Sequence, residues 1–430
     1  MLACHPAAPA PRLRQPERAQ PELRCLALDE LLPPDHPARP AWAFAAGLDL
    51  SPLYADIKAV EGHPGNTPID PRLLFALWLY ATIDGVGSAR ELDRLCEEHA
   101  AYRWLCGGVG VNYHTLADFR VAHGDLLDDQ LTHSVAVLLD AGLVTLDTVA
   151  QDGVRVRASA GADTFRRKPT LTEALGKARA HLDSLRAQDG EAAGAATARQ
   201  RAARDRAARE RVARLEAALA QMPALEASRE GHKKGTADQA RCSPTDPDAR
   251  NMKMADGGFR PAFNFQFATD ADAGLVVDTA VVNRGVDNGQ MGEALGRIRA
   301  RYGKGPARVL VDHGFASLAD ITAAAAGGTA VYMPVKNEQK VLAAGGDPYR
   351  PQPKDPPAAV AWRARMGTAE GKETYKRRAS TAEWVNAGCR NRGLSQVRVR
   401  GLARVRCCAL WQALAHNLLR AAALARPPRQ

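Results

Sequence analysis

The order of sequence signals predicts an α/β protein in which a helical N-terminal part precedes a mixed β-sheet. Helix start and stop signals run from about residue 45 to residue 140, and strand-like alternation begins after residue 140. Strands then resume after a long Ala-, Arg- and Glu-rich interruption and alternate with helices. A chain of 430 residues has room for two or three domains of roughly 100–200 residues each.

Residues 1–44 are rich in proline and arginine and are predicted to form an N-terminal arm. Such an arm could lie against the body or against DNA, or be a floppy terminus.

Residues 45–140 are predicted to form a helical domain. Asp70 and Pro71 supply an N-cap and a first-turn proline, a capping box opens the next helix at Ser88, and Thr115 is predicted to cap a third. Short helices joined by glycine-containing turns suit a DNA-binding helix-turn-helix domain, but they suit any small helical bundle as well.

The segment 143–156 is predicted to be a strand because β-branched residues alternate with others on both sides of Asp152. A helical-hairpin insertion with its loop is predicted over 165–255, since apolar residues recur at three-four spacing over 175–185 and 212–222. The glycine-containing stretch 189–198 is the predicted turn between its two helices.

After the insertion, strands are predicted over 263–269, 275–282, 308–312 and 329–335, with helices over 290–302 and from Ser317. Three antiparallel strands followed by alternating helices and strands is the order of an RNase H-like fold. In that fold the first and fourth strands are neighbours. The predicted RNase H-like catalytic domain spans 141–420, and 421–430 form a C-terminal tail.

The chain is basic, with 58 Lys and Arg against 48 Asp and Glu, a net charge of +10 and a pI near 9.3. DNA is therefore a plausible partner. Between Lys376 and Arg406, nine basic residues accompany a single acid, Glu383. A lone carboxylate in so basic a segment requires an explanation.

The eight cysteines contain no C-x-x-C pair, so neither a zinc site nor a disulfide framework is indicated. No apolar run approaches the roughly 18 residues of a membrane span. These features predict a cytoplasmic, nucleoid-associated protein that does not engage a membrane.

Two aspartates are predicted to meet at one edge of the sheet. Asp152 interrupts an otherwise apolar or alternating strand, and Asp312 ends a short apolar one before a His-Gly-Phe turn. Either alone would more simply be a solvated strand-end acid. Neighbouring strands would bring both carboxylates together, and carboxylate oxygens are the ligands that Mg²⁺ prefers.

Glu383 is the predicted third acid. Ser380 or Thr381 is expected to cap a helix that carries Glu383 near its start and Arg390 two turns further along the same face. A carboxylate beside arginines can serve a metal and a phosphate at once. A surface glutamate in a salt-bridged helix is the simpler alternative. The neighbouring Trp384 could stack on an unpaired base or belong to the core.

These motifs resemble those of bacterial insertion-sequence DDE transposases. Tyr375, Arg378, Glu383 and Arg390 resemble the Y-R-E-K signature, and the segments around Asp152 and Asp312 resemble those of the first two acids. The segment 71–120 is similar to the helical N-terminal module, including the H-T-x-x-x-F-R sequence that ends at Arg120.

The resemblance implies a DNA transposase that cleaves insertion-sequence ends and transfers them into target DNA. Its catalytic and metal-binding residues would be Asp152, Asp312 and Glu383, with two Mg²⁺ or Mn²⁺ ions as cofactors. Tyr375, Arg378, Arg390 and Arg392 are the predicted DNA-binding residues. The expected partners are double-stranded DNA (terminal inverted repeats and target) and a second copy of the chain on that DNA.

Two departures from the signature accompany the resemblance. Four residues rather than three separate Arg378 from Glu383, which would rotate Arg378 by about 100° on a continuous α-helix. Arg390 stands in place of a lysine. Glu373, expected in a loop before the helix, is the alternative third acid, while Asp287 is expected to be structural and Asn264 and Gln266 to line the cleft.

Two other functions are also compatible with the sequence. One is a DNA-binding protein that keeps the fold without cleavage, and the other is a related metal-dependent nuclease.

Overall fold

The computed structural model describes residues 18–19, 21, 25–59, 67–187, 195–231 and 235–425. Most of the predicted arm before residue 25, much of the predicted turn at 189–198 and the last five residues of the tail lie outside the described residues.

The N-terminal part is helical from a 3₁₀ turn at Leu28–Leu31 onward, and most of its starts match the sequence signals. Asp70 accepts a hydrogen bond from the Arg72 amide, and Ser88 accepts one from the Glu91 amide. Thr115 is not the cap of the third helix, because Asn112 accepts from the Thr115 amide and starts that helix earlier. The helices are α1 (Ala38–Gly47), α2 (Ser51–Ala55), α3 (Pro71–Ile83), α4 (Ala89–Glu98), α5 (Ala100–Cys106), α6 (Tyr113–Ala122) and α7 (Gly124–Asp140).

One mixed sheet forms the centre of the remaining chain, which confirms the predicted α/β class. Strand β1 pairs antiparallel with β3 on one side and parallel with β5 on the other, and β5 pairs parallel with β6. Both β2 and β4 pair with the far edge of β3. The strands are β1 (Thr148–Arg157), β2 (Arg250–Lys253), β3 (Phe259–Asp270), β4 (Val276–Val282), β5 (Arg308–Leu310) and β6 (Ala330–Tyr332).

Helices connect and cover these strands. A capping box at Ser317 starts α11, as its Ser-x-x-Asp sequence requires. Short 3₁₀ turns follow β1 at Ala162–Thr164 and precede β2 at Ala237–Gln239. The helices are α10 (Gln290–Tyr302), α11 (Leu318–Ala326), α12 (Glu338–Ala343), α13 (Pro357–Gly367), α14 (Ala369–Arg378), a π-helical turn (Ala379–Glu383), α15 (Trp384–Asn391) and α16 (Leu402–Leu424).

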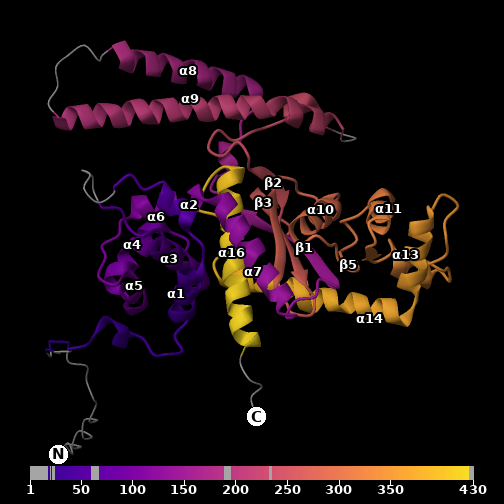
Figure 1. The fold of residues 1–430 in the computed structure, drawn as a ribbon. Coiled ribbons are helices and arrows are strands. Elements are labelled where there is room, and N and C mark those ends of the chain that lie inside the picture. Colours follow the sequence, from indigo (N-terminus) through magenta and orange to yellow (C-terminus); the bar gives the residue numbers. More distant parts are fainter. Residues whose placement is uncertain are drawn as a thin grey trace, which may run out of the picture.

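The predicted helical hairpin lies between β1 and β2. Helices α8 (Lys168–Ala187) and α9 (Ala195–Glu230) run side by side across one end of the molecule (Figure 1). They bury a small core of their own that includes Leu171, Leu215 and Met222. The apolar residues at three-four spacing therefore pack against each other within the hairpin.

Helix α16 joins the N-terminal helices to the sheet. It stands between the two parts (Figure 1) and contacts α3, α6 and α7 as well as β4. Trp411 packs against Phe75 with ring centroids 4.9 Å apart and donates its indole N–H to the Arg120 carbonyl. Residues from the helical part, β1, β3, β4 and α16 thus share one hydrophobic core.

A second core fills the space between β5, β6 and helices α10, α11 and α13. Trp362 donates its indole N–H to the Met333 carbonyl, which fixes α13 against the chain that leaves β6. Among the described residues, no helix combines the length and apolarity that crossing a membrane needs.

Asn417 tests the attachment of α16 to the sheet. Its side chain is 5% exposed, accepts from the Val276 amide at 2.8 Å and donates to the Val276 carbonyl at 2.8 Å. We expect Asn417→Ala to lower the free energy of unfolding by about 2–4 kcal/mol, because both strand groups lose a buried partner. Urea unfolding measures this, with Leu419→Ala on the exposed side of α16 as the control. Equal losses in the two variants would contradict the role given to Asn417.

Candidate active site

The parallel pairing of β1 with β5 places Asp152 and Asp312 at the same level of the sheet. Thr148 pairs with Arg308 and Ala150 with Leu310, so each aspartate lies two residues beyond the last pair. The predicted neighbourhood of the first and fourth strands of the catalytic part is confirmed. Burial is the main cause of the raised pKa of Asp152, and the charge of Asp312 adds to that rise, as expected for two nearby carboxylates.

Asp152 is held by two side chains from the C-terminal part. Its Oδ1 accepts from Nη2 of Arg378 at 3.0 Å, and its Oδ2 accepts from Nδ2 of Asn386 at 2.9 Å. The carboxylate is 20% exposed, and burial raises its pKa, while the Arg378 charge and the hydrogen bond from the Gly153 amide oppose that rise. Asp152 is thus a largely buried carboxylate whose charge depends on one guanidinium.

Asp312 lies at the exposed start of a tight turn. Its Oδ1 accepts from the His313 amide at 2.7 Å, and its carbonyl accepts from the Phe315 amide at 3.1 Å. Phe315 is 1% exposed and anchors the turn in the second core. The Asp-His-Gly-Phe sequence therefore presents the carboxylate to solvent while the phenyl ring fixes the backbone.

The helix that carries Glu383 begins earlier than its sequence signals predict. Thr368 caps α14, and Ser380 and Thr381 donate back to the Arg377 carbonyl instead of capping a new helix. The expected cap near Thr381 is wrong, because helical backbone continues from α14 through α15. Glu373 lies within α14 rather than in a loop, where it forms an exposed ion pair with Lys376.

A π-helical turn absorbs the extra residue between Arg378 and Glu383. On an uninterrupted α-helix, Arg378 and Asn386 would lie roughly 80° apart around the axis; removing one residue of rotation reduces this to roughly 20°. The turn at Ala379–Glu383 makes that correction, since its wider turn holds one more residue. Both side chains consequently reach Asp152 from one face of the helical segment.

Glu383 itself is exposed at the end of the π turn. Among the described residues, no group of three or more His, Cys, Asp or Glu side chains is arranged to hold a metal ion. The structure therefore brings Asp152 and Asp312 together but does not gather Glu383 with them into a three-acid cluster. Trp384 beside it is 46% exposed and meets the His416 ring edge-on at 5.0 Å.

The predicted DNA-binding residues occupy different positions. Tyr375 is half-buried close to Arg378 and both aspartates, and burial raises its pKa to about 12. Arg390 is exposed near the end of α15. Arg392 lies outside the acidic centre and donates to Gln412 of α16 at 3.4 Å.

A polar cluster lies behind the strand at Gly153. The Asp287 carboxylate accepts from Asn264 and from Gln266, each at 2.7 Å, and pairs with Arg155 at 3.4 Å. Asn264 and Gln266 are at most 1% exposed, so the prediction that they line an open cleft is wrong. They hold Asp287, whose charge in turn raises the pKa of Asp152.

Asn386 is a neighbour of Asp152 that the sequence did not single out, and Asp287 is one to which the sequence assigned only a structural role. A signal for Asn386 is present: it follows Glu383 by three residues on the same basic helix and so lies within one turn of it. Nothing comparable marks Asp287, because its partners come from a strand about 20 residues away.

Buried polar atoms without partners remain beside the carboxylate of Asp152. Nε of Arg378 and Oδ1 of Asn386 are both buried and have no hydrogen-bond partner among the described residues. Buried polar groups are normally satisfied. Two acids at one level of the sheet, an arginine and unpaired donor and acceptor atoms define a mixed α/β protein with an acidic centre.

Comparisons with known protein families match two segments of the chain. Residues 26–122 match a family described as "Transposase domain (DUF772)", and residues 353–422 match a "Transposase DDE domain". The second match includes Arg378, Glu383 and Asn386. No curated protein and no solved structure matches the chain. The two matches support the assignment of the chain to the insertion-sequence DDE transposases, proteins of mobile elements that act in transposition.

Arg378→Gln tests the dependence of Asp152 on its guanidinium. The folded-state pKa of Asp152 already lies above its ordinary value of 3.8, and loss of Arg378 raises it further. A carboxyl whose pKa is higher in the folded than in the unfolded protein destabilises the folded state. This destabilisation is absent below the unfolded-state pKa and is complete above the folded-state pKa. We expect a loss of about 1.5–3 kcal/mol at neutral pH that shrinks as the pH falls towards 4.

Urea unfolding at the two pH values measures this loss. Arg377→Gln is the matched control, since Arg377 pairs with the exposed Asp272. A loss in Arg378→Gln that does not change with pH would contradict the coupling.

Gly153→Ala tests the packing behind the site. An added Cβ would lie 2.4 Å from Oδ1 of Asp287 and 2.5 Å from Nε2 of Gln266. We expect a destabilisation of about 1–3 kcal/mol, measured by thermal or urea unfolding, because the polar cluster must shift. Gly292→Ala in α10 meets open space and should be neutral or stabilising by about 0.5–1 kcal/mol. A neutral Gly153→Ala would show that the cluster is loosely packed.

Proposed function

We propose that the chain cleaves DNA at the ends of an insertion sequence and transfers those ends into target DNA. The observation that carries this proposal is the placement of Asp152 and Asp312 at one level of the sheet, with Arg378 of the DDE-matched segment bonded to Asp152. An acidic pair beside an arginine suits a site that binds a metal and a phosphodiester together.

An RNase H-like fold is part of the proposal. Its support is the strand arrangement: antiparallel strands β1, β3 and β4, followed by parallel strands β5 and β6 on the other side of β1. A helix intervenes between β4 and β5 and another between β5 and β6, which the parallel connections require.

The oxygen atoms at the centre fit hard divalent cations. Asp152 and Asp312 supply carboxylates, and the unpaired Oδ1 of Asn386 lies beside Asp152. Magnesium tends to be held by one or two carboxylates together with water and substrate phosphate, so two strand-borne acids fit the first site. Glu383 is proposed to complete a second site, one helical turn before Asn386.

Divalent ions held there, Mg²⁺ or Mn²⁺, would lower the pKa of bound water and neutralise the charge of the reacting phosphate. Arg378 balances the charge of Asp152 in the structure described. With divalent cations bound at Asp152, the Arg378 guanidinium would be free to bind a non-bridging phosphate oxygen in the bidentate geometry that arginine favours. Tyr375 remains protonated near neutral pH, since its pKa is about 12, and its hydroxyl can donate to a phosphate.

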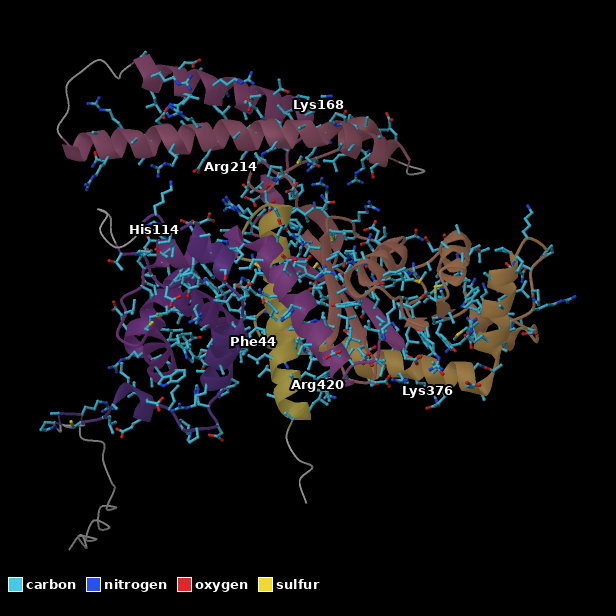
Figure 2. The ribbon with its side chains drawn as sticks, viewed as in Figure 1. Phe44, His114, Lys168, Arg214, Lys376 and Arg420 are labelled. Atoms are coloured by element: carbon cyan, nitrogen blue, oxygen red, sulfur yellow. The ribbon has the colours of Figure 1, made fainter. Side chains whose placement is uncertain are left out.

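Basic side chains on several elements offer further DNA contacts. Lys168 and Arg214 lie on the hairpin and Arg420 lies near the end of α16 (Figure 2). We propose that the helical part over 45–140 and the hairpin insertion contact double-stranded DNA, with terminal inverted repeats and target DNA as substrates. Pairing of two ends is proposed to need a homodimer on DNA.

One observation favours a second candidate, a DNA-binding protein without cleavage activity. Glu383 is exposed and lies in no three-acid cluster among the described residues. A related metal-dependent nuclease is the third possibility and would produce cleavage without joined products.

Cleavage of a supercoiled plasmid that carries the element and its flanks, with Mg²⁺ or Mn²⁺, tests the three acids. We expect Asp312→Ala and Glu383→Gln each to lower the cleavage rate at least about 100-fold, since loss of even a supporting group around a metal costs 10–100-fold. Glu373→Gln is the matched control and should stay within about twofold of the parent chain.

Undiminished cleavage after Asp312→Ala would sink the proposed function. Loss of cleavage in Glu373→Gln, with none in Glu383→Gln, would move the third acid to α14.

A further inference from the structure

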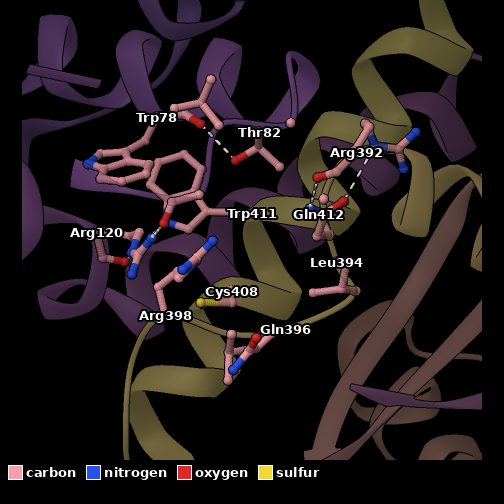
Figure 3. Close-up of a pocket in the computed structure, with 15 residues that line it drawn as sticks. Trp78, Thr82, Arg120, Arg392, Leu394, Gln396, Arg398, Cys408, Trp411 and Gln412 are labelled. Atoms are coloured by element: carbon pink, nitrogen blue, oxygen red, sulfur yellow. Dashed lines mark hydrogen bonds between the residues drawn. The ribbon is translucent and has the colours of Figure 1, made fainter. Parts of the chain in front are cut away.

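A basic pocket outside the acidic centre lies where the two transposase-matched segments meet. It is formed by the turn between α3 and α4, the inner side of α6, the loop after α15 and α16 (Figure 3). Arginines 120, 392 and 398 line it together with Trp78 and Trp411. The first belongs to the N-terminal match and the other two to the DDE match.

Arg120 is buried without an acidic partner. It is 8% exposed, its guanidinium lies 4.8 Å from the centre of the Trp78 ring, and one Nη donates to the Gly87 carbonyl. Its Nε is buried and has no hydrogen-bond partner among the residues that the structure describes. Within the described ranges, no carboxylate forms an ion pair with it. A buried charge of this kind is costly unless a counter-charge or another ligand compensates it.

The other two arginines leave that charge uncompensated. Arg392 donates to Gln412 at 3.4 Å (Figure 3) and to the Cys389 sulfur at 3.5 Å, and both partners are neutral. Arg398 is exposed at the mouth and takes part in no ion pair within the part of the chain that the structure describes. The Arg392 guanidinium lies against Gly388 and Cys389 of α15, whereas Arg120 and Arg398 line the cavity without a carboxylate partner among the described residues.

Two glycine turns fix the walls of the pocket against each other. Gly85 and Gly393 have φ angles of +80° and +81°, which suit glycine, and a Cβ on Gly393 would lie 2.8 Å from the Gly85 carbonyl oxygen. The backbones of the N-terminal and C-terminal parts therefore touch. The cavity between them is built into the core that α16 organises.

We infer that this pocket binds one phosphate group of the DNA backbone, an inference that rests on the proposed function. The cavity volume is about 60 Å³, which suits a compact anion rather than a base or a nucleotide. Guanidinium groups give charge-assisted and bidentate hydrogen bonds to phosphate oxygens. The unpaired Nε of Arg120 supplies a donor that the protein itself does not satisfy.

The pocket would also set the position of DNA relative to the acidic centre. Arg378 and Arg392 are fourteen residues apart along the helical segment that includes α15, a rise of roughly 21 Å. Successive phosphates of one strand advance about 3.4 Å along a duplex, so this span corresponds to roughly six nucleotides. A phosphate held in the pocket would anchor the duplex about half a helical turn from the scissile bond.

Salt-dependent DNA binding tests the inference without cleavage. The full chain is titrated in EDTA against a labelled duplex of about 30 base pairs, and log Kd is followed against log salt concentration. Arg398→Ala is the variant, since Arg398 is exposed and its loss leaves the core intact. Loss of one phosphate contact should lower the slope by about 0.9. Arg350→Ala is the matched control, because Arg350 is an exposed arginine in the loop before α13, and its slope should stay unchanged.

A second arm separates DNA phosphate from free phosphate. Inorganic phosphate is expected to raise the melting temperature of the parent chain and of Arg350→Ala, and to stabilise Arg398→Ala less. Equal slopes for Arg398→Ala and Arg350→Ala overturn the DNA assignment. If phosphate stabilisation is nevertheless lost in Arg398→Ala, the pocket is a site for free anions only.

Different results would contradict the proposed pocket and the proposed cleavage function. A pocket without effect on DNA binding leaves metal-dependent cleavage, and its loss in Asp312→Ala, untouched. A parent chain that binds no DNA in this titration overturns both.

Discussion

The hydrogen bonds that Asp152 accepts from Arg378 and Asn386 join parts of the chain that are 226 and 234 residues apart. Strand β1 is the first strand of the sheet, and the helical segment formed by α14, the π turn and α15 comes near the end of the chain. The arrangement around Asp152 therefore depends on the whole fold between them. Burial of Asp152 raises its pKa, and Arg378 limits that rise, so the site combines a destabilised carboxylate with the cation that stabilises it.

The π turn connects this interaction to the irregular spacing of the sequence motif. One additional residue would normally rotate Arg378 away from the face used by Asn386. The wider turn removes that rotation, and the hydroxyl groups of Ser380 and Thr381 bond back to the Arg377 carbonyl within it. Turns of this type occur often at functional sites. The irregularity is thus accommodated structurally, and Glu383 lies exposed at the end of the turn.

Helix α16 also joins distant parts of the chain, because it connects the N-terminal helices to the sheet. It packs against the N-terminal helices and against β4, and its Asn417 supplies both hydrogen bonds to Val276. The same helix contributes Trp411 and Gln412 to the arginine-lined pocket. Helix α15 lies between the acidic centre and the pocket along the chain, and α16 packs against it.

Local sequence signals by themselves determined most elements: the caps at Asp70, Ser88 and Ser317, the strands around Asp152 and Asp312, and the hairpin insertion, because capping and periodicity act over a few residues. They also determined that Asp152 and Asp312 belong together, since parallel neighbours end at a common edge. Only the tertiary structure decided the partners of Asp152. A π turn, the buried Asn264 and Gln266 behind Gly153, and Asp287 depend on packing between distant segments, which no local pattern encodes. For the same reason, the sequence identified Arg120 as the end of an N-terminal motif and Arg392 as a separate predicted DNA-binding residue, and only the fold placed them beside one pocket.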